Sequence, residues 1–235
     1  MTNLVNENAT KVGLRINCAK TKSMRIQCRE DQPDQPLSIN NGDIEDVQTF
    51  TYLGSVLTPD GGAETDVKYR IGKAATVFNR LWTIWASRSI STERKIQLYN
   101  SIVLPTALYA CETWKRTANI AHKIDVFHQR CLRRILRISY RDHVTNEEVL
   151  KRAKSNPLSS TVTERRLKFA GHTLRRPRHC HANVAMRWIP PGGKRKRGRP
   201  RKTWRRTFDE DLRQLNIEPD DVEKIAVDRV VCRHI

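Results

Sequence analysis

The chain has 235 residues and a formal net charge of +19, with 29% charged and 38% hydrophobic residues. A charge of this size calls for a polyanionic partner or a membrane surface. No apolar run approaches the length of a membrane-spanning helix, and the N-terminal residues lack the layout of a signal peptide. We therefore expect a nucleic-acid partner and no membrane.

The first 57 residues are expected to contain short strands. Residues 14–17 (LRIN) and 23–27 (SMRIQ) alternate apolar and polar side chains. Residues 40–43 (NNGD) are a turn signal, and residues 50–57 (FTYLGSVL) are a third strand-like run whose internal glycine indicates a bend or a close backbone approach. Residues 58–62 (TPDGG) then break the chain.

Beyond this break the hydrophobic period becomes helical. Apolar residues spaced by three and four predict one helix over residues 67–85 and another over residues 120–138. Between them lies a helix through residues 96–103, which Pro105 is expected to kink or end.

Helix starts are signalled by capping residues. Ser91 is the expected N-cap of the helix through residues 96–103. Residues 145–148 (TNEE) and 161–164 (TVTE) each fit a capping box and predict two short helices. Thr203 is expected to cap a last amphipathic helix that runs to Leu215.

The excess charge is one block near the C-terminus. Residues 165–208 contain 16 Lys and Arg and no Asp or Glu, while the rest of the chain holds 28 basic and 25 acidic residues. Its densest part, residues 194–206, reads KRKRGRPRKTWRR. The candidate nucleic-acid contacts here are Arg165, Arg166, Arg175, Lys194, Arg195, Lys196, Arg197, Arg199, Arg201, Lys202, Arg205 and Arg206.

Within this block, residues 197–200 (RGRP) have the core form of an AT-hook. Glycine and proline hold the backbone narrow and extended, so that Arg197 and Arg199 can enter the minor groove of A·T-rich DNA. Two simpler interpretations remain open, a nuclear localisation signal and a solvated basic tail.

A second basic feature lies on the third predicted helix. Arg130, Arg134, Arg137 and Arg141 are spaced by four, three and four residues, beside the apolar face that contains Cys131. An arginine edge next to a packed edge suits a surface that follows a phosphate backbone. The alternative is an outer helix face that is merely solvated.

The cysteines and histidines give weaker signals. The six cysteines form no CxxC pair and follow no secretory signal, so we expect reduced, mostly buried thiols. His172, His179, Cys180 and His181 lie close in sequence, but zinc usually takes two spaced pairs. We interpret these histidines as exposed or phosphate-facing, with a metal site as the alternative.

No motif for chemistry is present in the chain. It contains no nucleophile elbow, Walker loop, dinucleotide fingerprint or HExxH. The carboxylates available for Mg²⁺ are in loop-like sequence outside any hydrophobic-Asp-Asp turn: Asp31, Asp34, Asp43, Asp46 and Asp60. Alone, the chain is expected to lack phosphoryl-transfer activity and to bind no cofactor.

Six motifs follow one another along nearly the whole chain. They occupy residues 12–22, 50–55, 108–114, 127–136, 165–175 and 197–204. Together they resemble the C-terminal part of reverse transcriptases from non-LTR (LINE-type) retrotransposons. The first three resemble the strand motif after the catalytic aspartates, the primer-grip hairpin and the LYGxETW run of the thumb, with Ala110 where glycine is usual. The last three resemble the FxxRCLRxIL helix and the RRLxxxGHxxR and RGRPxxTW signatures.

This resemblance implies roles and partners. Lys20, with Lys22 as the alternative, matches a lysine often assigned as general acid for pyrophosphate. The residues that would hold the primer end are Phe50, Tyr52, Leu53 and Gly54. The implied partners are an RNA template and a DNA primer or target DNA, in the nucleus or in a cytoplasmic ribonucleoprotein before nuclear entry.

The aspartates that bind Mg²⁺, and an endonuclease domain, would lie before residue 1, in an upstream part of the same polyprotein. We therefore expect a mostly α fold with a small α+β part of short antiparallel strands. Residues 1–57 would be a palm remnant, 58–142 a helical thumb, and 143–235 a basic helical region.

The expected function is template and primer binding for an endonuclease–reverse transcriptase, without catalysis in this chain. The alternative is a chromatin-type DNA-binding protein that uses the AT-hook. Such a protein would not need Lys20 or the primer-grip-like hairpin.

Overall fold

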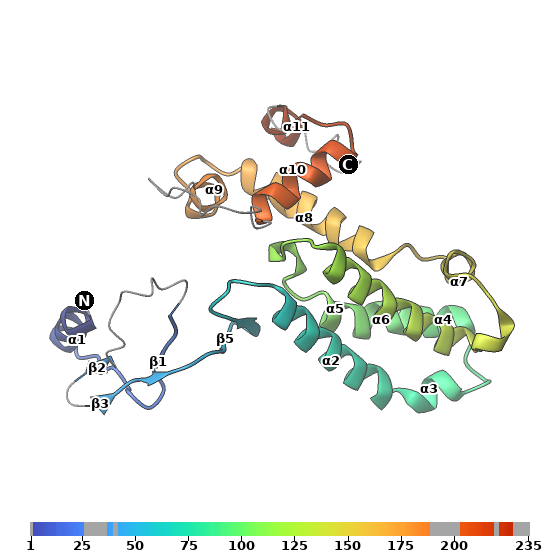
Figure 1. Cartoon of the computed structure of the whole chain (residues 1–235), viewed down its shortest axis with the longest axis horizontal. Coiled ribbons are helices and arrows are strands. Elements are labelled where there is room, and N and C mark those ends of the chain that lie inside the picture. Colours follow the sequence, from blue (N-terminus) through green and yellow to red (C-terminus); the bar gives the residue numbers. More distant parts are fainter. Residues whose placement is uncertain (1, 26–36, 40–41, 189–202, 219–220, 228–235) are drawn as a thin grey trace. The chain divides into compact units, whose positions relative to one another are not determined.

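The computed structural model describes residues 2–25, 37–39, 42–188, 203–218 and 221–227. The chain divides into two compact units, Met1–Tyr69 and Arg70–Ile235. The fold is mostly α with a small part that combines one helix with short strands, as the sequence predicts (Figure 1). None of the helices in the described ranges is long and apolar enough to cross a membrane.

The first unit contains helix α1 and three two-stranded sheets. Its elements are α1 (Thr2–Lys11), β1 (Lys22–Ser23), β2 (Ser38–Ile39), β3 (Gly42–Asp43), β4 (Glu45–Asp46), β5 (Phe50–Tyr52) and β6 (Ser55–Leu57). The pairs β2–β3 and β5–β6 are antiparallel, whereas β1–β4 is parallel. Ile39 and Ile44 are buried and form a small core.

In this unit one local prediction is wrong and one element was missed. Residues 14–17 are not a strand, and the helix α1 before them was not predicted. Alternation of apolar and polar residues makes a strand only where another strand is available to pair with. Residues 14–17 pair with none in the described part of the chain, so only Lys22 and Ser23 in this region join a sheet.

The run over residues 50–57 is a hairpin. Phe50 pairs with Leu57 and Tyr52 with Ser55. The two residues of the turn, Leu53 and Gly54, have φ angles of 48° and 81°. Both values are left-handed, which is what the type I′ turn of a two-residue hairpin requires. The internal glycine therefore marks a chain reversal.

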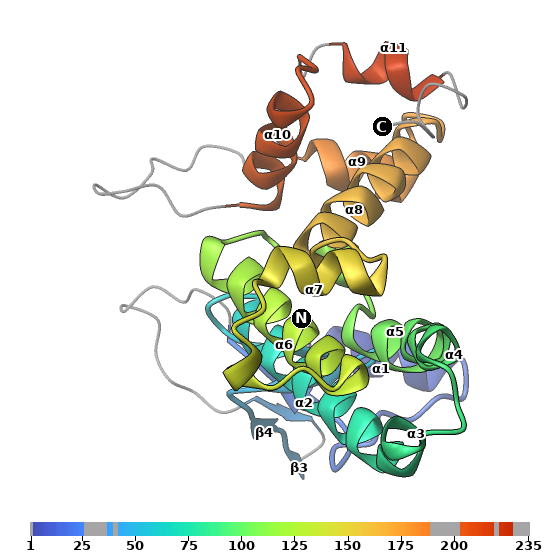
Figure 2. The same ribbon diagram turned by 90° about the vertical axis from the view of Figure 1, so that its right-hand side faces the viewer.

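The second unit is helical, and α2 begins before its boundary. The helices are α2 (Glu64–Arg80), α3 (Trp82–Ala86), α4 (Thr92–Leu98), the π-helix η1 (Tyr99–Val103), α5 (Leu104–Ala107), η2 (Cys111–Thr113), α6 (Ala118–Leu136), η3 (Tyr140–Asp142), α7 (Asn146–Ala153), α8 (Leu158–Leu174), α9 (His181–Arg187), α10 (Trp204–Gln214) and α11 (Val222–Val227). Helix α8 packs against η2 and α6, and also against α10 and α11 (Figure 2).

Two apolar centres hold this unit together. Around α6, Ile124 and Leu132 are buried, and the Phe78 and Trp85 rings stack with centroids 5.0 Å apart. Along α8, a second cluster forms where α10 packs, and it contains Leu167, Ala170, Phe208 and Leu212. The basic C-terminal helices thus belong to the same packed unit as the helices predicted as the thumb.

Most predicted caps are confirmed. The side chains of Ser91, Thr145 and Thr203 accept hydrogen bonds from backbone N–H groups in the first turns of α4, α7 and α10. The cap at Thr161 is wrong, because α8 begins at Leu158 and Thr161 lies inside it. Packing of Leu158, which is buried, extends that helix past its predicted start.

Two long predicted helices are shorter than expected. The helix over residues 67–85 breaks at Leu81 into α2 and α3. The third helix ends at Leu136, because Arg137 adopts a left-handed conformation with φ of 58°. Arg141 therefore lies in η3 and does not continue the helical stripe.

Candidate nucleic-acid interface

Five of the nine described cations in the basic block of residues 165–208 form ion pairs. The block contains no acidic residue, so the carboxylates come from outside it, either from the same helix or from a neighbouring one. Glu223 of α11 pairs with both Arg178 and Arg187. The other ion pairs of the block are Arg166–Asp211, Lys168–Glu164 and Arg206–Glu210. Much of the block's described charge is therefore compensated locally.

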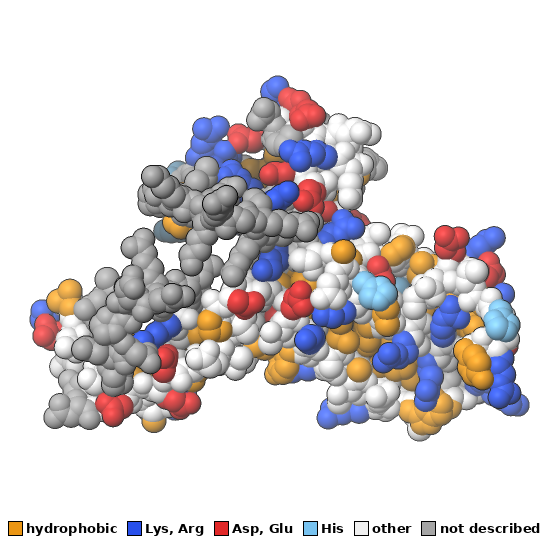
Figure 3. All heavy atoms as spheres, in the orientation of Figure 1, with side chains coloured by type: hydrophobic (Ala, Val, Ile, Leu, Met, Phe, Trp, Pro, Cys, Tyr) orange, Lys and Arg blue, Asp and Glu red, His pale blue; other side chains and the backbone are white. Residues whose placement is uncertain are grey.

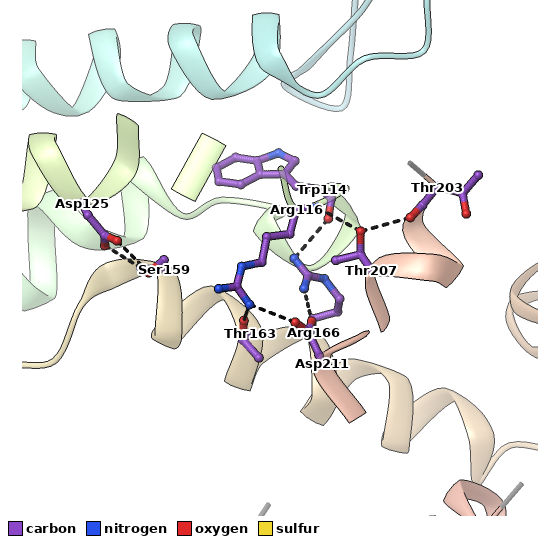
Figure 4. Close-up of polar contacts among 9 residues, drawn as sticks. All are labelled: Trp114, Arg116, Asp125, Ser159, Thr163, Arg166, Thr203, Thr207 and Asp211. Atoms are coloured by element: carbon purple, nitrogen blue, oxygen red, sulfur yellow. Dashed lines mark hydrogen bonds and ion pairs between the residues drawn. The ribbon is translucent and has the colours of Figure 1, made fainter. Parts of the chain in front are cut away.

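The Arg166–Asp211 pair is the buried centre of this network (Figure 4). Arg166 and Asp211 are 0% and 1% exposed. Arg166 donates one hydrogen bond to Asp211 Oδ2 and another, of 3.2 Å, to the backbone oxygen of Trp114. Arg116 donates to Asp211 Oδ1 at 3.1 Å and to Thr163 Oγ1 at 3.5 Å. One carboxylate thus binds two arginines from two segments.

The start of α10 is attached to the same junction. Trp204 Nε1 donates to the backbone oxygen of Glu112 at 2.7 Å, and Arg116 N donates to Thr207 Oγ1 at 3.2 Å. Thr207 in turn donates to the backbone oxygen of Thr203 at 3.0 Å. Residues from three of the six sequence motifs therefore meet here as structural contacts.

Of the described cations predicted to bind nucleic acid from residue 165 onward, only some remain accessible. Arg166 is buried in its ion pair with Asp211, so its guanidinium does not reach the surface where a nucleic acid would bind. Arg165 and Arg175 are half-buried and donate to the backbone oxygens of Leu108 and Ala226. Arg205 and Arg206 are exposed. The others, Lys194, Arg195, Lys196, Arg197, Arg199, Arg201 and Lys202, lie outside the described residues.

The arginines near the C-terminal end of α6 differ from this block. Arg130, Arg134, Arg137 and Arg141 are all exposed, and none forms an ion pair within the described part of the chain. Arg137 donates to the backbone oxygens of Ala86 and Ser87, at 2.6 and 3.1 Å. Figure 3 shows Lys and Arg side chains interspersed with apolar ones over the helices of this unit. This end of α6 keeps its positive charge.

The candidate residues of the first unit are accessible to different degrees. Lys20 is exposed in a turn, whereas the ammonium of Lys22 pairs with Glu45. On the β5–β6 hairpin, Tyr52 and Leu53 are 58% and 76% exposed. Phe50 and Gly54 are half-buried.

Potential metal ligands do not converge in the described residues. No three His, Cys, Asp or Glu side chains there form a group that could hold a metal ion. Asp46 pairs with Arg25, and Asp60 accepts hydrogen bonds from Thr58 and Gly62. Asp31 and Asp34 lie outside the described residues. His172, His179 and His181 are exposed.

A buried polar chain under α6 was not found from the sequence. The Tyr99 hydroxyl lies 2.9 Å from His128 Nδ1, and His128 Nε2 lies 3.1 Å from Ser155 Oγ. His128 is 1% exposed, and burial lowers its pKa to about 4. In the sequence, His128 is marked only by its place beside Phe127, on the predicted apolar face of this helix.

Four cysteines in the described ranges are free: Cys18, Cys111, Cys131 and Cys180. Burial raises the pKa of Cys111 to about 11 and that of Cys131 to about 12. Both buried thiols therefore stay protonated and behave as apolar core groups. Cys28 and Cys232 lie outside the described residues.

Comparison with known proteins gives one distant relative. The chain is 27% identical over 208 residues to a putative uncharacterized transposon-derived protein of Caenorhabditis elegans, an alignment that covers 84% of this chain and 72% of the relative. No family model matches the chain, and no solved structure matches it.

Proposed function

We propose that this chain binds template and primer as part of a reverse transcriptase from a LINE-type retrotransposon and does not catalyse DNA synthesis alone. Two observations on sequence support the proposal. Six motifs that resemble this family occur in order over nearly the whole chain. The relative in C. elegans is described as transposon-derived, which agrees with an origin in a mobile element.

The observation that carries the binding function is the set of arginines near the C-terminal end of α6. These four arginines, Arg130, Arg134, Arg137 and Arg141, are exposed and free of ion pairs in the described part of the chain. Uncompensated guanidinium groups on a packed helix can neutralise phosphates and release counterions. The basic residues 194–202 add seven further cations.

The remaining assignments rest on the resemblance. Lys20 is the proposed general acid, and the exposed β5–β6 hairpin is the proposed contact for the primer end. The metal-binding aspartates would be supplied by the upstream part of the polyprotein. The proposed partners are an RNA template and a DNA primer or target DNA, with nuclear localisation.

The test measures the affinity of the chain for labelled nucleic acids by fluorescence anisotropy at three salt concentrations. If about six phosphates are neutralised on duplex DNA, the log–log salt slope is expected near −5. Exchanging the seven Lys and Arg of residues 194–202 for Gln should flatten the slope. This variant keeps Thr203 and Trp204, which hold the start of α10 in place.

A matched pair of double variants tests the α6 arginines. Arg130→Gln with Arg141→Gln should weaken binding and lower the slope by about two units. The control, Arg152→Gln with Lys168→Gln, makes the same change in charge at cations already paired with Glu148 and Glu164. Equal losses in both double variants would refute an interface at this end of α6.

The alternative function is a chromatin-type protein that binds A·T-rich DNA through residues 197–200. The sequence of this segment favours it, although the segment lies outside the described residues. Arg199→Ala should then weaken binding to A·T-rich duplexes by about 1–2 kcal/mol more than binding to G·C-rich ones. Equal weakening on both duplexes and on an RNA hairpin would reduce the segment to a phosphate contact.

A further inference from the structure

Helix α3 packs against α6, and η3 follows the C-terminal end of α6 in the chain (Figure 1). Two exposed aromatic rings, one on α3 and one on η3, lie beside arginines in this corner. Trp82 is 49% exposed, and Arg134 Cζ lies 4.4 Å from the centre of its ring. Tyr140 is 82% exposed, and Arg141 Cζ lies 5.8 Å from its ring centre. Aromatic rings that are accessible beside guanidinium groups can stack on the planar faces of a ligand.

The helix that carries Trp82 is held firmly at its C-terminal end. Lys95 Nζ donates to the backbone oxygens of Trp85 and Ser87, at 3.0 and 2.6 Å. Arg137 donates to the oxygens of Ala86 and Ser87 from the end of α6. Two cations thus satisfy the last carbonyls of α3 and fix it to α4 and α6.

This corner of the unit carries more cations than carboxylates. Lys95, Arg134, Arg137 and Arg141 lie here, whereas Glu93 faces Lys154. Asp142, which accepts from the backbone N–H of Ser139, is the carboxylate beside Arg141. Burial, followed by the charge of Arg137, lowers the pKa of Lys95. A polyanion would restore the balance.

We infer that the Trp82–Arg134 and Tyr140–Arg141 pairs form a stacking platform for unpaired bases of single-stranded nucleic acid. Aromatic and guanidinium planes stack on the faces of bases, which are open in a single strand and already occupied in a duplex. Arg130 and Arg137 lie close enough along the chain to meet the adjoining phosphates. The inference rests on the proposed nucleic-acid binding and narrows it to unpaired nucleotides.

The test uses the full chain and four labelled ligands of equal length: single-stranded DNA, single-stranded RNA, duplex DNA and an abasic single strand. The double variant Trp82→Leu with Tyr140→Leu keeps apolar bulk and removes both ring faces. Its affinity for the two base-containing single strands should fall about tenfold. Its affinity for the duplex and the abasic strand should stay unchanged, because these depend on phosphate contacts.

The matched control is Phe169→Leu, at an aromatic ring on α8 that is 46% exposed and lies outside this corner. It should bind all four ligands as the wild type does. Thermal unfolding of each variant shows whether the fold is retained. If Trp82→Leu with Tyr140→Leu unfolds early, Tyr140→Leu alone tests the platform, because that side chain is the more exposed of the two.

The outcomes separate the two proposals. Wild-type binding to none of the ligands overturns both the platform and the proposed function. Wild-type binding that the double variant leaves unchanged, or reduces equally on all four ligands, overturns the platform and leaves the nucleic-acid function intact. A higher affinity for one of the two single strands shows whether the platform prefers RNA or DNA.

Discussion

At the scale of single residues, the partner of each cation decides what that cation can do. Arg166 forms an ion pair with a buried carboxylate, Lys95 donates to backbone oxygens, and Arg134 lies over an aromatic ring. Only the last arrangement leaves the charge at the surface. The same residue type therefore serves the core in one place and a ligand in another.

We expect Asp211→Asn to destabilise the protein strongly. The change removes the negative charge between Arg116 and Arg166 and leaves Arg166 charged and buried, which costs about 3–5 kcal/mol. Urea denaturation measures the loss. The control, Asp209→Asn, replaces a half-buried carboxylate of the same helix outside this network and should change stability by less than about 1 kcal/mol. Similar losses of unfolding free energy in both variants would contradict a stabilising role for the ion pairs of Asp211.

His128 should make stability depend on pH in the acid range. Its pKa is lowered to about 4 in the fold, against 6.5 in the unfolded chain, so between these values the unfolded chain binds more protons. Stability therefore falls as pH falls from 6.5 to 4, by up to about 3 kcal/mol. His128→Gln should flatten this part of the profile.

The control for this prediction is His122→Gln, at an exposed position of the same helix. It should leave the profile over pH 4 to 6.5 as in the wild type. Because other groups also titrate there, the comparison is between the slopes of the variants. A wild-type slope in the His128 variant would show that this histidine is protonated in the fold.

At the scale of elements, helix starts were predictable where the signal is local. A capping hydroxyl and its N–H partner are three residues apart, as at Ser91, Thr145 and Thr203. Helix ends and extensions were less predictable. The start of α8 depends on burial of Leu158, and the end of α6 on the left-handed backbone of Arg137, neither of which a local pattern shows.

Two threonines with the same sequence signal should respond differently to alanine. Thr145→Ala removes a real N-cap and should cost about 1 kcal/mol. Thr161→Ala lies inside α8, where alanine is the better helix former, and should change stability by less than about 0.5 kcal/mol. Chemical denaturation compares the two. A larger loss at Thr161 would place the start of that helix where the capping pattern predicted it.

At the scale of the whole chain, the residues of the proposed function are divided between the two units. The first holds the exposed β5–β6 hairpin and Lys20, and the second holds the arginines of α6 and the C-terminal helices. The buried junction around Asp211 joins α8 and α10 to the segment before α6. Deleting α10 should therefore lower the stability of the whole second unit and not only of its C-terminal helices.

The purified chain is expected not to extend a DNA primer on an RNA template. We expect this chain to lack the aspartate pair that holds Mg²⁺, so that the attacking hydroxyl and the departing pyrophosphate would not be clamped. Primer extension followed on a gel, with a no-protein control, measures this. Template-dependent product above that control would contradict the prediction. Restored extension on adding an upstream fragment would support the proposed division of labour.

The sequence alone determined the helical class, the capped starts of α4, α7 and α10, the size of the positive charge and the order of the motifs. These features depend on spacings of a few residues or on composition. Tertiary structure decided which charges are available, because the partners of the cations come from distant segments. Arg166 meets Asp211 across 45 residues, and Arg137 reaches Ala86 across 51. No local pattern encodes such contacts, so the buried junction and the aromatic–arginine platform emerged only from the fold.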